Sequence, residues 1–193
     1  KKTLIVPFFS PFYSPLIPSA FRPLGCRVEV LPPQDKASVE FGLKTINNDM
    51  CYPSILVAGD IIKAFQSGRY DPENTAVILT QTGGQCRASS YVSLVRKGLA
   101  AVGMDNVSVI TLSGEGIDPQ TGFVIDEKGL VKRLALGVIF TDPLARMYLS
   151  TAAREKTPGT AGSLHGKYLS EMETGIENAD YDYLLNLLGK AVA

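Results

Sequence analysis

The residues Ala76–Thr80, AVILT, form a continuous apolar run that constrains the fold more than any other stretch of the sequence. Such a run is typical of a strand that is buried on both faces of a parallel sheet. Strand-like patterns also occur at Thr3–Phe9, Arg27–Leu31 and Val107–Leu112. Parallel neighbours need a crossover connection, which is usually a helix. The sequence therefore predicts helices between these strands.

Three such helices are expected, at about 15–24, 53–67 and 88–102. Each is followed by a glycine, Gly25, Gly68 or Gly103, as is common where a helix ends. The stretch 36–46 fits neither the helical period nor the strand period, so it stays unassigned. Residues 1–112 are thus predicted to form a Rossmann-like α/β domain with the order β-α-β-α-β-α-β.

The pattern changes after Ser113, where a loop is followed by helical segments. These are expected at 129–153, interrupted near Asp142-Pro143, and at about 164–176 and 181–192. Residues 113–193 are therefore predicted to form a C-terminal helical annex to the parallel sheet.

Composition excludes several classes of function. The 193 residues carry 19 Lys and Arg against 19 Asp and Glu, so no net charge attracts the protein to nucleic acid or to an anionic membrane. No apolar run approaches the roughly 20 residues that span a bilayer, and the start lacks a secretory signal pattern. We expect a cytoplasmic protein. Because the chain begins with Lys and opens almost directly on a strand, we also expect a fragment of a larger protein.

Two of the three cysteines, Cys51 and Cys86, each lie in a turn just before a predicted helix. The partial positive charge at a helix N-terminus favours a thiolate, and Arg87 beside Cys86 adds to it. Thiolates bind soft metals and iron–sulfur clusters, attack electrophiles or form disulfides, whereas a buried cysteine can also simply pack as a small hydrophobe. Cys26 is expected in a helix-to-strand turn at the opposite edge of the sheet, where we predict a structural role.

Gly83 and Gly84 follow the Ala76–Thr80 strand and allow a phosphate or a cluster sulfur to approach the backbone closely. No complete nucleotide-binding motif accompanies them. The only histidine, His165, has no second histidine or C-x-x-C motif to complete a zinc site, and no G-x-S-x-G motif indicates a hydrolase. It is interpreted as a surface or helix-start residue.

The segments NNDMCYPSILVAGDIIKAFQSGRYDPENTAVILTQTGGQCRASSYVSLVRKGLAAVG and SPFYSPLIPSAFRPLGCRVEVLPP resemble a known family. Over about residues 4–112 the chain is similar to the 2-hydroxyacyl-CoA dehydratase-like region of acyl-CoA dehydratase activase-related proteins (the CoA-substrate-specific enzyme activase family). The resemblance implies a [4Fe–4S] cluster held by cysteines and reduced at low potential by an ATP-hydrolysing activase. Cys51 and Cys86 match its ligand cysteines, and Cys26 matches none.

The chain departs from the family pattern in lacking the ATPase module and any cysteine after Cys86. A cluster normally takes three or four protein ligands, so further ligands would come from a missing segment or a partner chain. The first hypothesis is a low-potential electron-transfer module with Cys51 and Cys86 as metal ligands and with Gly83, Gly84 and Arg87 stabilising the cluster. The second is a non-catalytic docking domain that contacts the ATPase module, and the third is a Cys51–Cys86 disulfide, which needs Cα atoms within about 7 Å.

Overall fold

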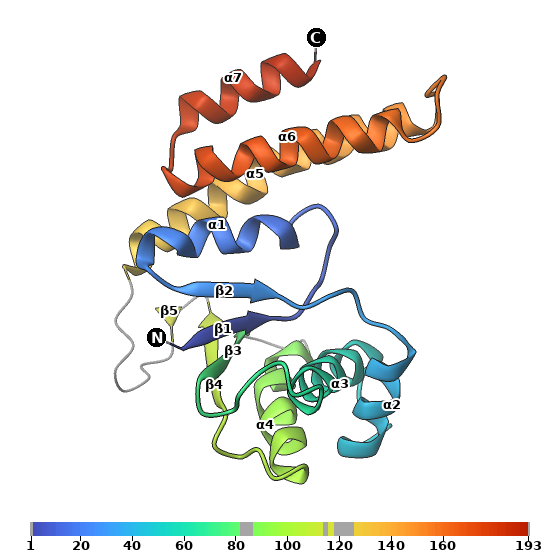
Figure 1. Ribbon diagram of the computed structural model, residues 1–193, viewed down its shortest axis with the longest axis vertical. Coiled ribbons are helices and arrows are strands. Elements are labelled where there is room, and N and C mark those ends of the chain that lie inside the picture. Colours follow the sequence, from blue (N-terminus) through green and yellow to red (C-terminus); the bar gives the residue numbers. More distant parts are fainter. Residues whose placement is uncertain (1, 82–86, 114–115, 118–125, 193) are drawn as a thin grey trace. The chain divides into compact units, whose positions relative to one another are not determined.

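The computed structural model describes residues 2–81, 87–113, 116–117 and 126–192 (Figure 1). The chain divides into two compact units. The first comprises Lys1–Phe8 and Cys26–Val124, and the second comprises Phe9–Gly25 and Ile125–Ala193. The chain thus enters the second unit twice, whereas the sequence pattern alone suggested one boundary at residue 112.

The described residues form a five-stranded sheet in the first unit, with the strand order β2-β1-β3-β4-β5. The strands are β1 (Thr3–Val6), β2 (Arg27–Val30), β3 (Thr75–Thr80), β4 (Ser108–Ser113) and β5 (Gly116–Ile117). The first four are parallel, and β5 runs antiparallel to β4. The predicted Rossmann-like parallel α/β architecture is therefore confirmed, while β5 lies in a stretch that had been interpreted as loop.

Strand β3 occupies the centre of the sheet, and its first five residues are buried. Val77 lies opposite Ile5 of β1 and Val109 of β4, so three β-branched side chains form one row across the sheet. They pack in a core with Ile61 and Ile62. The continuous apolar run in the sequence reflects this double burial.

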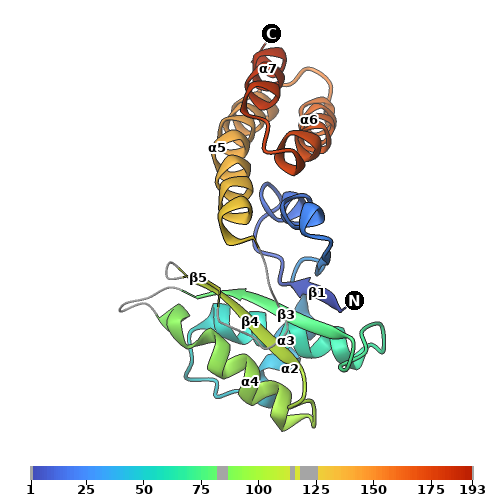
Figure 2. The same ribbon diagram turned by 90° about the vertical axis from the view of Figure 1, so that its left-hand side faces the viewer.

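The helices of the first unit cover one face of the sheet (Figure 2). They are α2 (Lys36–Thr45), α3 (Tyr52–Gln66), the short η3 (Arg87–Ser90) and α4 (Tyr91–Ala101), and α3 packs against both α2 and α4. The unassigned stretch 36–46 is therefore a helix. Its buried residues are Ser38 and Gly42, which are small, so no large apolar residue marks its buried face in the sequence.

The second unit contains one helical run from the N-terminal half of the chain and three helices from the C-terminal part. They are η1 (Ser14–Leu16), α1 (Ile17–Phe21), η2 (Arg22–Leu24), α5 (Glu127–Ala152), α6 (Thr160–Glu177) and α7 (Tyr181–Val192). Helix α1 contacts α5 and α6, and α6 also contacts α5 and α7. The expected stop at Gly25 is confirmed by its positive φ of 67°.

Helix α5 corrects one prediction, because it continues through Pro143 instead of breaking there. A proline inside a helix costs about 3 kcal/mol. The residues around it, Phe140, Thr141, Leu144 and Ala145, are all buried, so packing on both sides of the proline offsets that cost.

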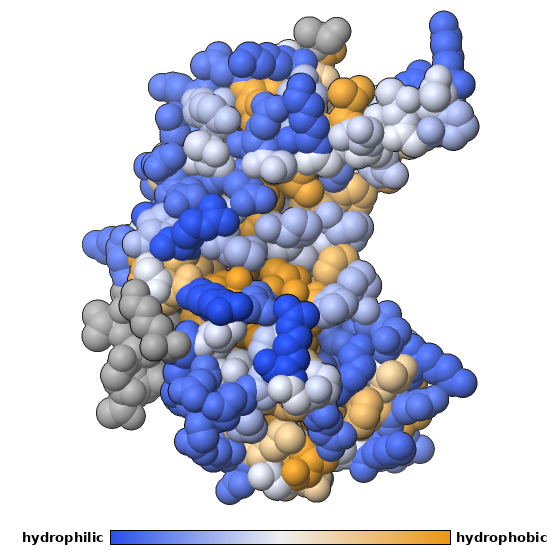
Figure 3. Space-filling model, viewed as in Figure 1, coloured by the Kyte–Doolittle hydropathy of each residue, from blue (hydrophilic) through white to orange (hydrophobic). Residues whose placement is uncertain are grey.

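The surface of the second unit is partly apolar. Orange patches interrupt its hydrophilic surface in Figure 3. The exposed apolar side chains of this unit include Val131, Val138, Ile139, Leu149 and Leu185. Within the described parts of the chain, no helix combines the length and the apolar character needed to cross a membrane.

Candidate functional site

Cys51 is the N-cap residue of α3, with an extended backbone (φ −61°, ψ 137°). Tyr52 and Pro53 lie in the first turn of α3. Backbone N–H groups in a first turn have no partner within the helix, so a proline, which lacks an N–H, loses no hydrogen bond there. Ser54 donates to the Cys51 carbonyl oxygen from its backbone N–H (2.9 Å) and from its hydroxyl (2.7 Å). Local hydrogen bonds therefore fix the half-buried thiol at a helix N-terminus, as the sequence predicted.

The thiol also lies beside the segment that follows β3. Its Sγ is 3.6 Å from the hydroxyl oxygen of Tyr91, the first residue of α4. Gln81 follows β3 directly, and its side-chain Nε2 donates to the carbonyl oxygen of Ser89 (3.0 Å). Its backbone N–H donates to the carbonyl oxygen of Leu112 at the end of β4 (2.8 Å). The start of α3, the start of α4 and the carboxyl ends of two strands therefore meet around Cys51, at the edge where parallel α/β sheets bind ligands.

The electrostatics of this edge favour a thiolate. Burial raises the pKa of Cys51, but hydrogen bonds from Tyr91 and from the N–H and hydroxyl of Ser54, together with the positive charge of Arg87, outweigh burial and lower the pKa below its ordinary value. Arg87 is exposed and begins η3. The sequence paired Arg87 with Cys86, whereas in the structure the charge of Arg87 acts on Cys51.

Three other predicted site residues, Gly83, Gly84 and Cys86, lie outside the described residues. Tyr91, by contrast, is a residue of this site that the sequence analysis did not indicate. Its contact with Cys51 joins residues 40 positions apart, and no sequence motif signals such a tertiary contact.

Cys26 follows Gly25 and directly precedes β2, in the predicted helix-to-strand turn at the amino end of the strand. His165 belongs to the second unit, within α6. Its interpretation as a surface or helix-start residue is wrong in one respect, because its ring is half-buried against two aromatic rings. Among the residues that the structure describes, no group of three or more His, Cys, Asp or Glu side chains could hold a metal ion.

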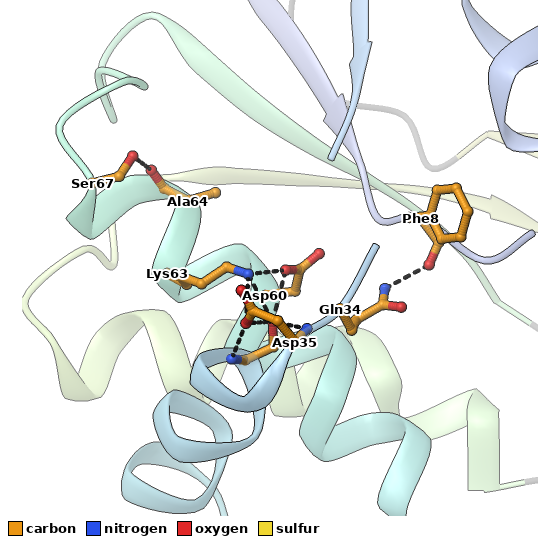
Figure 4. Close-up of polar contacts among 8 residues, drawn as sticks. Phe8, Gln34, Asp35, Asp60, Lys63, Ala64 and Ser67 are labelled. Carbon is orange, nitrogen blue, oxygen red and sulfur yellow. Dashed lines mark hydrogen bonds and ion pairs between the residues drawn. The ribbon is translucent and has the colours of Figure 1, made fainter. Parts of the chain in front are cut away.

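A second polar cluster joins α2 to α3 in the first unit (Figure 4). Lys63 Nζ lies 3.0 Å from Asp35 Oδ1, 3.1 Å from Asp60 Oδ1 and 2.9 Å from Ser38 Oγ. The Ser38 hydroxyl donates to Asp60 Oδ1 at 3.0 Å. A serine next to a lysine amine can be a nucleophile, but Ser38 is 0% exposed, so no substrate reaches it. We therefore assign this cluster to the packing of α2 on α3.

No protein-family model, no curated protein and no solved structure matches this chain. The fold and the site define a Rossmann-like α/β protein with a thiolate-favouring cysteine at the carboxyl edge of its sheet.

Proposed function

We propose that this chain is part of a low-potential electron-transfer module that holds a [4Fe–4S] cluster through Cys51 and Cys86. Following the sequence resemblance, its partners would be an ATP-hydrolysing activase module and a (2-hydroxy)acyl-CoA dehydratase in the cytoplasm. The single observation that carries the proposal is the environment of Cys51, which favours a thiolate at the ligand-binding edge of the sheet.

Cys51 fits the chemistry of a cluster ligand. Cluster cysteines bind as thiolates, so a site that already lowers the thiol pKa loses less free energy on deprotonation. Cys51 is also only half-buried, which leaves its sulfur room to contact a ligand. The described residues supply this one thiolate; in our proposal Cys86 supplies a second, and the remaining ligands come from outside this chain.

The surrounding residues would bind and tune the cluster. A bound [4Fe–4S] cluster supplies one-electron transfer at a potential set by its net charge, its hydrogen bonds and its exposure. Arg87 would offset negative charge, and the Tyr91 hydroxyl, whose oxygen lies 3.6 Å from Sγ, would donate a hydrogen bond to a thiolate ligand. Hydrogen bonds from neighbouring residues orient the side chains that bind a metal centre and shift its reduction potential. Gly83 and Gly84 would let the backbone approach the cluster closely.

A docking domain is the second candidate function. Tyr52 begins α3 beside Cys51, and its side chain is 58% exposed. Exposed tyrosines are enriched in protein–protein interfaces. In this case the turns 47–53 and 81–87 contact the ATPase module and the cysteines only pack.

The deciding experiment is the iron and sulfide content, with the visible absorption spectrum, of protein purified and reconstituted without oxygen. We expect a broad thiolate-to-iron band near about 400 nm that is lost in Cys51→Ser and in Cys86→Ser. Cys26→Ser is the matched control, because Cys26 lies at the opposite end of the strands, and it should retain the band.

Wild-type protein that stays colourless and takes up no iron would reject the cluster. Loss of ATPase-module binding in Tyr52→Ala, without any iron signal, would then support the docking domain. A thiol titration that finds two fewer thiols until a reductant is added, but not in Cys51→Ser, would support the Cys51–Cys86 disulfide instead.

A further inference from the structure

His165 is the only histidine in the chain, and its imidazole packs between two aromatic side chains of the second unit. The Phe12 ring meets it edge-on, with the ring centres 5.4 Å apart and the planes at 89°. The Tyr148 ring of α5 lies 5.0 Å away at 42°. Phe12 and Tyr148 also contact each other at 6.0 Å. The imidazole therefore joins α6 to α5 and to the loop that precedes η1.

The loop Phe9–Tyr13 is held to these helices at two points. One is the Phe12 contact, and the other is a hydrogen bond of 3.3 Å from the Tyr13 hydroxyl to Asp142 Oδ1. The other hydrogen bonds of the loop with described residues are local. Phe9 and Ser10 donate their N–H groups to Ser14 Oγ, Phe12 donates its N–H to Ser10 Oγ, and the carbonyl oxygens of Ser10 and Tyr13 accept from the N–H groups of Ser14 and Leu16. Phe12 contacts both His165 and Tyr148, so the His165 ring provides one of the side-chain contacts that hold this loop to α5 and α6.

The surroundings of the imidazole disfavour its protonation. Its Nε2 atom is buried and has no hydrogen-bond partner among the described residues. A neutral ring tolerates an unpaired acceptor nitrogen, whereas an imidazolium would carry a buried N–H without an acceptor, which is unfavourable. The attraction of a cation to the Tyr148 ring at a partly exposed site is weaker than this cost.

Within the parts of the chain that the structure describes, no charged neighbour compensates an imidazolium. Burial alone lowers the pKa of His165, and no acidic or basic group contributes to the shift. Asp142 pairs with Arg146 at 3.1 Å, and the Tyr168 hydroxyl donates to the Lys190 carbonyl oxygen at 3.0 Å. The elements around the ring carry the following charged or titratable residues: Tyr13 in the loop; Glu127, Lys128, Lys132, Arg133, Asp142, Arg146 and Tyr148 on α5; Arg154, Glu155 and Lys156 in the turn after α5; Lys167, Tyr168, Glu171, Glu173 and Glu177 on α6; and Tyr181, Asp182, Tyr183 and Lys190 on α7.

We propose that His165 is a proton-sensitive latch, which holds the Phe12 loop against α5 and α6 while its ring is neutral and releases the loop when the ring is protonated. The loop leads directly into η1 and α1, so its release loosens the only part of the second unit that comes from the N-terminal half of the chain. This inference is independent of the proposed iron–sulfur function.

The direction of the pH dependence follows from linkage. The pKa of His165 is lower in the latched state than its ordinary value of about 6.5. Above that value both states are neutral and the latch has its full stability. As the pH falls through about 6.5, the open state takes up the proton first, so the latched state loses stability.

The test is amide hydrogen exchange of the Phe9–Tyr13 loop, corrected for the intrinsic pH effect on exchange, between about pH 8 and pH 5. Protection should fall by up to about tenfold per pH unit below the ordinary histidine pKa, the limit for linkage to one proton. Because the chain has one histidine, an NMR titration reports this imidazole without ambiguity.

His165→Phe keeps an aromatic ring between Phe12 and Tyr148 but cannot take up a proton, so its loop should stay protected across the whole range. Tyr13→Phe removes the other attachment and should lower protection at every pH while keeping the pH dependence. The proposal is overturned if the imidazole of the wild-type protein titrates at or above the ordinary value, a result that needs no variant to fold. It is also overturned if His165→Phe loses protection on acidification as the wild type does.

Discussion

At the scale of single residues, Asp60 shows how one buried charge is only partly compensated. Its side chain is completely buried; Oδ1 accepts from Ser38 and Lys63, but Oδ2 has no partner within the described residues. Burial raises the pKa of this carboxyl group despite the ammonium group of Lys63. Asp35, exposed on the other side of the same ammonium group, has a pKa lowered to about 2 by the Ser38 N–H and Lys63.

Asp60→Asn should stabilise the protein at neutral pH by about 1 kcal/mol or more, because a buried charge is replaced by a neutral group of the same shape. A carboxyl group whose pKa is raised in the folded state stabilises that state below its unfolded pKa and loses this contribution as the pH rises through the folded pKa. The advantage of the variant should therefore disappear near about pH 3, where Asp60 is protonated in the wild type. Urea unfolding as a function of pH measures both effects.

Asp35→Asn is the matched control, because asparagine also caps a helix but cannot pair with Lys63. It should lose stability at neutral pH, with the opposite sign to Asp60→Asn. If Asp60→Asn is less stable than the wild type at neutral pH, the pairing of Asp60 with Lys63 outweighs the cost of burial.

The sequence predicted the site residue by residue only where the chemistry is local. The position of Cys51 at a helix start follows from Pro53. The effect of Arg87 on Cys51 does not, because the sequence paired Arg87 with Cys86. The Tyr91 hydroxyl beside the thiol does not, because the sheet brings the two helix starts together. His165 was misjudged for the same reason, since Phe12 and Tyr148 are distant in sequence.

At the scale of elements, the contact between α2 and α3 depends on glycine. A Cβ atom built on Gly59 would lie 1.8 Å from the Ser38 carbonyl oxygen, and one on Gly42 would lie 2.2 Å from that of Ile55. The two helix backbones therefore touch, which leaves no room for side chains between them. Periodicity failed to assign α2 because it detects large apolar residues, whereas this interface excludes them.

Gly59→Ala should destabilise the protein by more than the 1–3 kcal/mol or so typical of overpacking, because the new methyl group meets backbone atoms that cannot rotate away. The matched control is Gly166→Ala in the middle of α6, where a Cβ meets nothing within 4 Å. It should stabilise the protein by about 0.5–1 kcal/mol through helix propensity. Thermal unfolding measures the stability of both variants. Equal stability of the two would contradict the close approach of α2 and α3.

Other elements were predicted well or poorly for equally physical reasons. Apolar residues occupy the buried positions of the four parallel strands and of α3, α4, α6 and α7, so the sequence predicts these elements. Strand β5 has two residues, Gly116 and Ile117, too few to show a period. The continuation of α5 through Pro143 depends on packing by α1, α6 and α7, which local propensity does not include.

At the scale of the whole molecule, the run from Ser14 to Leu24 was expected as the crossover helix between β1 and β2. Its helical conformation was predicted correctly, but the structure groups Phe9–Gly25 with α5–α7 in the second unit. Within that unit Leu16, Ala20 and Phe21 are buried. Contacts with residues more than 100 positions away determine this grouping, so no local pattern reveals it.

A chain that ends at Val124 should therefore fold poorly. It keeps the run Ser14–Leu24 but lacks the helices that cover Leu16 and Phe21, and burying each such side chain contributes about 1.5–3 kcal/mol. The exposed apolar face should make the shortened chain self-associate and bind a hydrophobic dye. Light scattering after size-exclusion chromatography, with dye fluorescence, measures this outcome.

The control is the same shortened chain with Phe9–Gly25 replaced by a flexible polar linker of about a dozen residues, the length that a parallel crossover needs. That chain retains the residues of the first unit and removes the uncovered apolar helix, so it should be monomeric and unfold cooperatively. If the chain ending at Val124 is equally monomeric and unfolds at the same temperature, the run Ser14–Leu24 does not depend on α5–α7. The grouping of Phe9–Gly25 with the C-terminal helices would then make no contribution to stability, and the expected boundary near residue 112 would describe the folding units better.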